Sequence, residues 1–121
     1  MLDIRTNSCL QGVIALNSRV TFYVPTTTNV NQSADTGAVV DAVGVLFSDL
    51  FGGATTSPAV GLWKSPACGL VRESVTLIYS YCTDAQLQAG INAVIDKARE
   101  VRDMLEQEAV SIEINGALYF I

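Results

Sequence analysis

The chain has 121 residues, enough for one domain, and its hydrophobic share of 50% with only 16% charged residues excludes a disordered chain. Its net charge of −5 argues against binding to DNA or RNA, because phosphate contacts need a basic face. It contains no histidine, which excludes the commonest general base, the commonest metal ligand, and Ser-His and Cys-His nucleophile pairs.

Two interpretations stay open for the first segment, residues 1–18: an N-terminal arm, or an extra strand over residues 9–16. The single α+β domain is expected to span residues 19–121. From Arg19 to Val24, apolar and polar residues alternate, and the β-branched and aromatic content favours a strand. One face of this strand would carry Val20, Phe22 and Val24.

The next element is a helix that Asp35 or Thr36 can cap and that runs to about Phe51. Gly52 and Gly53 are expected to end it, because glycine adopts the left-handed conformation at little cost. Its buried stripe would consist of Val39, Val43, Leu46, Phe47 and Leu50.

A hairpin follows, with strands over residues 55–64 and 70–81 and a turn over residues 65–69. Pro58 cannot donate a ladder hydrogen bond, which predicts that the first of these strands lies at a sheet edge. In the second strand, one alternating set is expected to face the helices: Val71, Glu73, Val75, Leu77 and Tyr79. The opposite set is Arg72, Ser74, Thr76, Ile78 and Ser80.

Residues 83–106 contain the clearest helix signal in the chain. Thr83 and Gln86 stand at the spacing of a capping box, and apolar residues then recur at helical intervals from Leu87 to Leu105. Arg99–Asp103 and Arg102–Glu106 are spaced for ion pairs on the polar side. A strand over residues 109–114, the hairpin turn Asn115-Gly116 and a last strand over residues 117–121 complete the order.

This order predicts a ferredoxin-like βαββαβ antiparallel sheet with two helices on one face and an extra C-terminal hairpin strand. The uncovered face would carry Trp63, Tyr23, Ile78 and Tyr119, too apolar for an open surface. The last strand is apolar on both sides at a sheet edge, which invites pairing with another chain. We therefore expect a homo-dimer or a higher homo-oligomer. The alternative is that the N-terminal arm folds back over one of these surfaces.

Candidate site residues are few. Glu73 is charged within an apolar set, so it is a candidate catalytic acid, base or ligand anchor if it is buried, and a solvated side chain if it lies at the sheet end. An aromatic ligand platform is the second candidate, with packing between subunits as its alternative. The proposed ligand-binding residues are Trp63, Tyr23, Glu73, Ile78 and Tyr79.

No metal or cofactor is expected. Cys9, Cys68 and Cys82 match no zinc spacing and no disulfide framework, and we expect them to be buried or half-buried free thiols. There is no run of about eighteen apolar residues for a membrane span. The N-terminus lacks a basic-then-apolar signal pattern, so a cytoplasmic location is the default expectation.

Three blocks carry a family resemblance: Phe51-Gly52-Gly53-Ala54-Thr55-Thr56, Gly61-Leu62-Trp63, and the strand Val71-Arg72-Glu73-Ser74-Val75-Thr76-Leu77. They resemble small uncharacterised domains of bacterial, phage and mobile-element genomes. The resemblance covers roughly residues 19–114. It implies a ferredoxin-like fold and no established activity.

The absence of catalytic clusters favours a non-enzymatic oligomeric module that binds a small organic ligand or a protein partner at its sheet face or subunit interface. One alternative is a cofactor-independent enzyme of the dimeric α+β-barrel type, for which Glu73, Tyr79 and Arg72 are the available groups. The other is a mobile-element accessory protein that binds a host protein.

Overall fold

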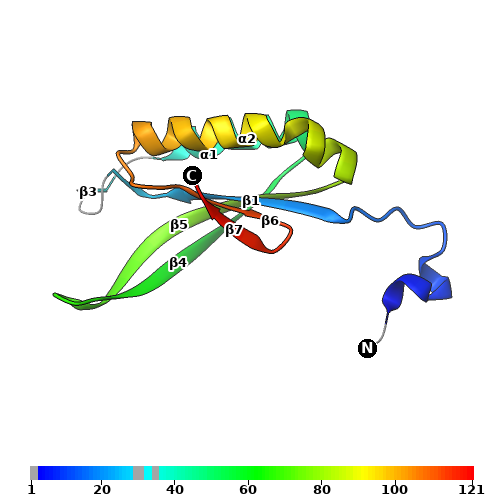
Figure 1. Ribbon diagram of the computed structural model, residues 1–121, viewed down its shortest axis with the longest axis horizontal. Helices are drawn as coiled ribbons and strands as arrows, with labels where there is room; N and C mark the ends of the chain where they lie inside the picture. Colours follow the sequence, from blue (N-terminus) through cyan, green and yellow to red (C-terminus); the bar gives the residue numbers. More distant parts are fainter. Residues whose placement is uncertain (1–2, 29–31, 34–35) are drawn as a thin grey trace.

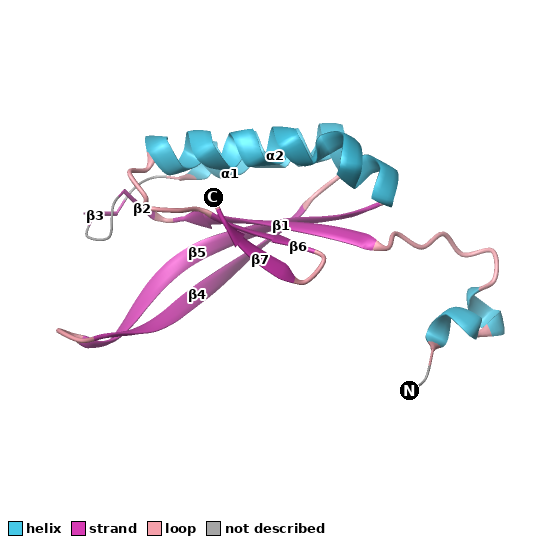
Figure 2. Ribbon diagram, in the orientation of Figure 1, coloured by secondary structure: helices cyan, strands magenta, loops and turns pink. Residues whose placement is uncertain are grey.

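The computed structural model describes residues 3–28, 32–33 and 36–121, and it shows two helices covering one face of a five-stranded antiparallel sheet (Figures 1 and 2). The strand order is β4-β5-β1-β6-β7. The expected ferredoxin-like arrangement with an added C-terminal hairpin strand is confirmed. The helices are α1 (Gly37–Phe51) and α2 (Asp84–Met104). The sheet strands are β1 (Ser18–Pro25), β4 (Thr55–Ser65), β5 (Gly69–Cys82), β6 (Ser111–Ile114) and β7 (Ala117–Phe120). A separate two-stranded ribbon pairs β2 (Thr27–Thr28) with β3 (Gln32–Ser33).

Helix α1 starts after Thr36, whose side chain makes no capping hydrogen bond, and the alternative cap Asp35 lies outside the described residues. Gly52 ends the helix with a φ of 91°, the left-handed conformation expected there. The buried residues are Val39, Val43, Phe47 and Phe51. Leu46 and Leu50, which were expected in the buried stripe, are only half-buried, and Phe51 is buried in addition.

Helix α2 has the expected capping box. The Thr83 hydroxyl accepts a hydrogen bond from the Gln86 amide at 3.1 Å, and the Gln86 side chain accepts one from the Thr83 amide at 2.9 Å. Gly90 is buried where α2 meets α1, and a Cβ there would lie 3.2–3.3 Å from atoms of Leu50 and Phe51. A glycine at this point therefore sets the close approach of the two helices.

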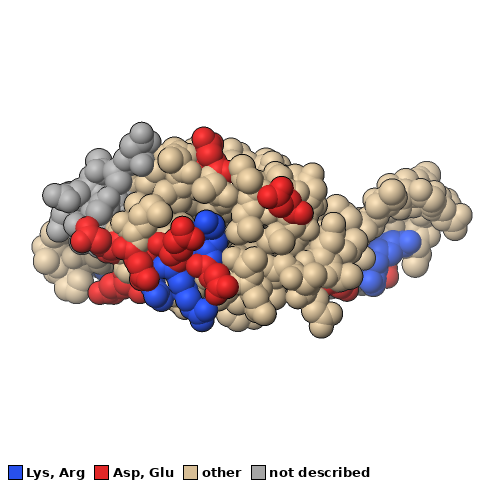
Figure 3. Space-filling view, turned by 90° about the horizontal axis from the view of Figure 1, so that it is seen from above, with Lys and Arg blue, Asp and Glu red and all other residues tan. Residues whose placement is uncertain are grey.

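The polar side of α2 carries basic and acidic side chains mixed in one cluster above the helix layer (Figure 3). Its ion pairs are Asp96–Arg99, Lys97–Glu100 and Arg102–Asp103. The expected pairs Arg99–Asp103 and Arg102–Glu106 are replaced by these shorter-range ones. Each pair lies at the surface with at least one exposed partner, and each is worth well under about 1 kcal/mol.

The core lies between the helices and the central strand β1. Val20, Phe22 and Val24 are fully buried, and Phe22 meets Phe47 edge to face with ring centroids 6.3 Å apart. In β5, the buried residues are Ile78, Ser80 and Cys82, which pair with Phe22, Val20 and Ser18 of β1.

The expected facing of β5 is therefore wrong. Residues opposite each other in an antiparallel pair point to the same side, so the inward set is the one that contains Ile78. The set with Glu73, Val75, Leu77 and Tyr79 lies on the open face instead. Tyr119 also changes sides, because it pairs with the core residue Ile112.

The β4–β5 hairpin extends beyond the helices, which leaves its outer half without cover (Figure 1). Trp63 lies there and is 46% exposed, together with Leu62 and Leu70. The expected edge position of the strand with Pro58 is confirmed, and β7 forms the opposite edge.

Residues 3–17 form an exposed arm that projects past the start of β1 (Figure 1). The arm contains two single turns of 3-10 helix, η1 (Ile4–Thr6) and η2 (Ser8–Leu10), and residues 11–17 lie in neither helix nor strand. Cys9 in the arm and Cys68 at the hairpin tip are exposed, contrary to expectation, and Cys82 is buried. No helix of the described residues is long and apolar enough to cross a membrane.

Candidate functional site

The open face of the sheet contains a hollow of about 380 Å³ where β5, β1 and β6 lie side by side. Strand pairing builds it, because Arg19 lies opposite Tyr81, Thr21 opposite Tyr79, and Glu113 of β6 opposite Thr21. Its volume falls within the range of small-molecule sites. We call it the aromatic hollow; its lining is Arg19, Thr21, Tyr23, Leu77, Tyr79, Tyr81 and Glu113.

Three tyrosines line the aromatic hollow. Tyr79 and Tyr81 stand two residues apart on β5, with ring centroids 6.3 Å apart and planes at 88°. Tyr23 on β1 and Tyr79 are half-buried, and Tyr81 is exposed. Ring faces and edges in this arrangement can contact a flat heterocycle or a cation.

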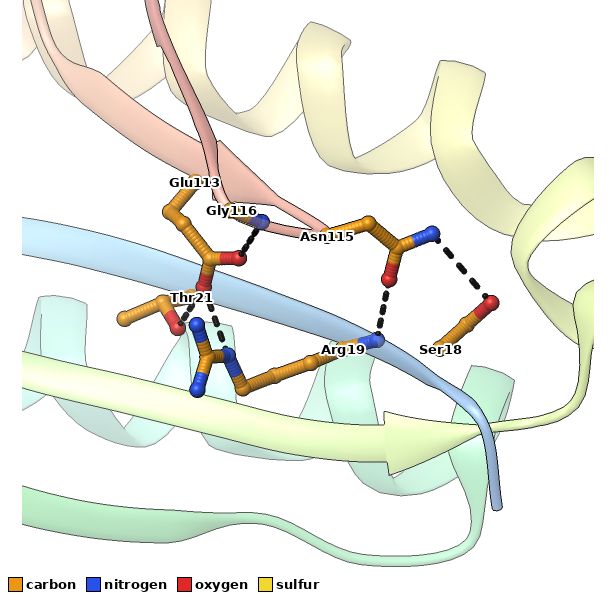
Figure 4. Close-up of polar contacts among 6 residues, drawn as sticks. All are labelled: Ser18, Arg19, Thr21, Glu113, Asn115 and Gly116. Atoms are coloured by element: carbon orange, nitrogen blue, oxygen red, sulfur yellow. Dashed lines mark hydrogen bonds and ion pairs between the residues drawn. The ribbon is translucent and has the colours of Figure 1, made fainter. Parts of the chain in front are cut away.

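Glu113 lines the β6 side of the aromatic hollow, and its carboxylate accepts three hydrogen bonds (Figure 4). Its Oε1 accepts from Arg19 Nε at 2.9 Å and from the Thr21 hydroxyl at 2.6 Å, and its Oε2 accepts from the Gly116 amide at 2.6 Å. Glu113 is only 8% exposed, although it lies between two apolar residues of a short strand. We call these four residues the Glu113 clasp.

The clasp sets the charge state of the site. Burial raises the pKa of Glu113, but the hydrogen bonds from Arg19, Thr21 and Gly116, with the Arg19 charge, outweigh burial and hold its pKa below the ordinary value. Glu113, and then Tyr81, raise the pKa of Arg19. At neutral pH the pair is therefore ionised and has no net charge. A carboxylate held in this way is a poor general base, since such a base needs a raised pKa.

The β6–β7 turn fixes the backbone next to the clasp. Asn115 and Gly116 have φ values of 50° and 90°, which the expected hairpin turn requires. Asn115 binds both backbone groups of Arg19. Its side-chain Oδ1 accepts a hydrogen bond from the Arg19 backbone amide at 2.7 Å, and its own backbone amide donates one to the Arg19 carbonyl at 3.0 Å. The turn therefore aims the Arg19 side chain at Glu113 (Figure 4).

A second hollow of about 250 Å³ adjoins the first and shares Tyr23 with it. Glu73 lies here with Gly61 of β4 and with Gln107 and Ser111. Glu73 is exposed, so it is the solvated side chain at the sheet end and not a buried charge. We call this space the Glu73 hollow.

The structure brings together only some of the residues proposed from the sequence. Tyr23 and Tyr79 line one hollow, and Glu73 lies in the next. Trp63 pairs with Val71, which is eight residues from Tyr79, or about 26 Å along the strand. Ile78 has no exposed surface and lies in the core, so it cannot contact a ligand on the open face.

Arg19, Thr21, Leu77 and Glu113 are the lining residues that sequence reasoning did not propose. Arg19, Thr21 and Tyr23 are every second residue of the first strand and share its polar face, which was one usable signal of a site. The lone glutamate Glu113 in an apolar strand was another. In the described part of the chain, no group of three or more acidic or cysteine side chains is placed to hold a metal ion.

Comparison with known proteins gives a result at the level of structure only. No family model matches the chain, and no curated protein matches it in sequence. The fold is similar to that of a phage SAM lyase in complex with S-methyl-5'-thioadenosine, with a TM-score of 0.62 and 18% identity over 89% of this chain and 91% of that one. The phage SAM lyase in the apo state gives a TM-score of 0.57 and 17% identity over 87% and 88% of the two chains.

This likeness corrects the functional expectation. The hypothesis of a non-enzymatic module is contradicted by this likeness, because the protein that shares the fold is an enzyme, a phage SAM lyase. The likeness favours the alternative of an enzyme. The resemblance to phage domains holds in a coarser form: the chain is a small α+β domain with the fold of a phage SAM lyase.

Proposed function

We propose that this protein cleaves S-adenosylmethionine (SAM) in the aromatic hollow and releases S-methyl-5'-thioadenosine. The observation that carries the proposal is the lining of that hollow, where three tyrosines face an ionised arginine–glutamate pair. The same fold in the phage SAM lyase bound to S-methyl-5'-thioadenosine supports the choice of substrate.

The parts of SAM match the parts of the hollow. Its adenine is a flat ring that can stack on a tyrosine, and its sulfonium is a cation of the kind that aromatic faces attract. Its amino-acid end carries a carboxylate. Arg19 donates to Glu113 through Nε, and its side chain remains 43% exposed, so the exposed part of its guanidinium can also hold that carboxylate.

The proposed reaction is an internal displacement. One oxygen of the substrate carboxylate attacks Cγ of the amino-acid chain, and the electrons of the Cγ–S bond pass to sulfur. The products are homoserine lactone and neutral S-methyl-5'-thioadenosine, and no proton is gained or lost. Arg19 is proposed to orient the carboxylate through its other oxygen, which leaves the attacking oxygen free.

The charge of the hollow suits this step. Carboxylate and sulfonium cancel as the bond breaks, so the transition state is less charged than the substrate. A site with net negative charge would stabilise the substrate's sulfonium more than the transition state and slow the reaction. The Arg19–Glu113 pair is neutral overall, and the tyrosines replace water with weakly polar surface.

An elimination is the competing route: a base would remove a Cβ proton and give vinylglycine with S-methyl-5'-thioadenosine. Glu113 is held ionised by three hydrogen bonds, and Glu73 lies in the adjoining hollow, exposed to water. Neither is placed as a strong base, so we favour the displacement.

The aromatic hollow is open to solvent, and we propose that a second copy of the chain covers it. A homo-oligomer agrees with the apolar side chains exposed on the projecting hairpin and on β7. Cover would exclude water from the neutral site and strengthen its electrostatic contacts.

The test is to incubate the purified full-length chain with SAM, to follow S-methyl-5'-thioadenosine by liquid chromatography, and to identify the second product by proton NMR. We expect homoserine lactone and its hydrolysis product, homoserine. Vinylglycine would contradict the displacement, and no release of S-methyl-5'-thioadenosine above the spontaneous rate would contradict the whole proposal.

Matched variants tie the activity to the hollow. Tyr79→Ala should weaken SAM binding by roughly 5- to 30-fold, since one aromatic–cation contact is worth about 1–2 kcal/mol, and Tyr79→Phe should retain the wild-type affinity. Arg19→Met should reduce turnover. Lys64 is an exposed cation on the projecting hairpin, and Lys64→Met should leave turnover unchanged. Equal activities for Arg19→Met and Lys64→Met would remove Arg19 from the mechanism.

A further inference from the structure

We propose that the N-terminal arm of one copy pairs, through residues 13–16, with the outer edge of β7 in a second copy. The occupant of that edge is thus a segment of the same protein. The inference rests on the arm, the edge and the anchoring of the arm root, and it does not depend on the proposed reaction.

The arm has the composition of an unpaired strand. From Thr6 to Ser18 it contains no charged residue and no proline. Its apolar side chains are exposed, and Ile14 is 89% exposed, although such side chains favour burial. The exposed apolar residues of the pairing segment are Val13, Ile14 and Leu16.

The outer edge of β7 offers backbone groups for pairing. Val110 and Ile121 exchange both of their hydrogen bonds, at 3.0 and 2.9 Å. Bonded and non-bonded pairs alternate in an antiparallel ladder, so Ile112–Tyr119 is also a bonded pair, and the amide and carbonyl groups of Leu118 and Phe120 point away from β6. Phe120 is 72% exposed, and none of the four residues of β7 is charged.

The other sheet edge is protected. Strand β4 carries Pro58, which lacks an amide donor, and Lys64 near its end. Proline and lysine are the residues that natural edge strands use against pairing. Of the two edges, β7 is therefore the one open to an added strand.

The root of the arm directs it away from the β7 of its own chain. Asn115 holds the amide and carbonyl of Arg19, and the Ser18 hydroxyl donates to Asp84 at the start of α2. Leu16 then lines a hollow together with Phe51 and Tyr81, on the β5 side of β1, whereas β7 lies on the other side beyond β6. To reach the outer edge of its own β7, the arm would have to reverse and cross about three strand spacings, roughly 14 Å.

The exposed apolar area sets an upper limit on the contact. A fully exposed aromatic side chain offers about 150–250 Å² and an aliphatic one roughly half of that, so the exposed apolar side chains of the arm segment and of β7 amount to at most roughly 500 Å² in each copy. Exchange of arms between two copies would bury at most about 1,000 Å² of side-chain area, the size of a small specific interface.

Cross-linking between differently tagged chains tests the pairing. In a Cys9→Ser, Cys68→Ser background, one chain carries Ile14→Cys and a chain of different mass carries Phe120→Cys, and a short bis-maleimide joins them. We expect cross-linked species that contain one of each chain. Their absence from the mixture would overturn the proposal, as would a double variant that links only within a single chain.

Association in solution gives the second measurement. Ile14→Asp and Phe120→Asp each place a charge in the proposed pairing and should weaken self-association at least about tenfold, by light scattering after gel filtration. Both side chains are exposed in the single chain, so folding should be retained. Val45→Asp, an exposed position on α1, is the matched control and should leave the assembly unchanged. A wild-type chain that stays monomeric, or three variants that behave alike, would contradict the exchange.

Discussion

Removal of the Glu113 carboxylate should destabilise the whole protein, because this one group joins β1, β6 and the β6–β7 turn. In Glu113→Ala, Arg19 and the Gly116 amide can recover hydrogen bonds from water, since both are partly or fully exposed. Thr21 cannot, because it is only 7% exposed. A buried hydroxyl without its partner costs about 1–3 kcal/mol, and the lost charged hydrogen bonds add to this.

We therefore expect Glu113→Ala to lose about 2–3 kcal/mol of unfolding free energy. For a domain of this size, that is a fall in Tm of roughly 8–12 °C. Glu113→Gln keeps the shape and one acceptor, so its loss should be about half as large.

The pH dependence has a definite sign. The pKa of Glu113 is lower in the folded chain than its ordinary value of 4.5, so the carboxylate's contribution to stability is complete above about 4.5 and is lost as the pH falls through the lowered value. The stability difference between wild type and Glu113→Gln should therefore shrink from about pH 6 to about pH 3.

Urea unfolding followed by circular dichroism measures these differences. Glu108→Ala, which removes an exposed carboxylate between α2 and β6, is the control and should change the unfolding free energy by less than about 0.5 kcal/mol. If Glu113→Ala behaves like this control, or if its difference from wild type grows as the pH falls, the clasp does not stabilise the fold as described.

Three further predictions test individual elements by thermal unfolding. Gly52→Ala should cost about 1 kcal/mol because φ is 91° there, whereas Gly53→Ala, without a positive φ, should cost less; equal losses would contradict the helix stop. Thr83→Ala removes the capping box and should lose about 1 kcal/mol of unfolding free energy, whereas Thr83→Ser keeps the hydroxyl and should not; equal stabilities of the two variants would show that the cap contributes nothing. Ile78→Ala should lose about 2–5 kcal/mol and half-buried Val75→Ala clearly less, and the reverse order would refute the facing of β5.

Much of the fold was predictable because its local signals agree with its global arrangement. The capping box at Thr83, the glycine stop at Gly52 and the Asn115-Gly116 turn are all found where chain chemistry requires them. Pro58 lies on an edge strand, as a missing amide donor demands.

The facing of β5 could not be found from its own alternation. Val71, Val75 and Leu77 form the more apolar set, which favours an inward assignment. However, β5 extends beyond the helices, and its pairing with β1 determines which of its residues face them. Ile78 is buried because it lies opposite Phe22, a contact between distant segments that no local pattern contains.

The Arg19–Glu113 part of the candidate site was missed for the same reason. Arg19 and Glu113 are separated by 94 residues along the chain, and only the strand order brings them to a 2.9 Å contact. Tyr23 and Tyr79 were identified as ligand candidates from their aromatic character, and their place in one hollow follows from the β1–β5 register. Whether they bind a ligand stays a prediction.

The most direct test of the central claim is a titration of the ¹⁵N-labelled protein with S-methyl-5'-thioadenosine, followed by amide NMR shifts. The account predicts that the largest shifts occur on β1, β5 and β6, at Thr21, Tyr79, Tyr81 and Glu113. Shifts confined to the outer side of α1, at Val45 and Ser48, or no shifts at saturating ligand, would show that the aromatic hollow is not the site.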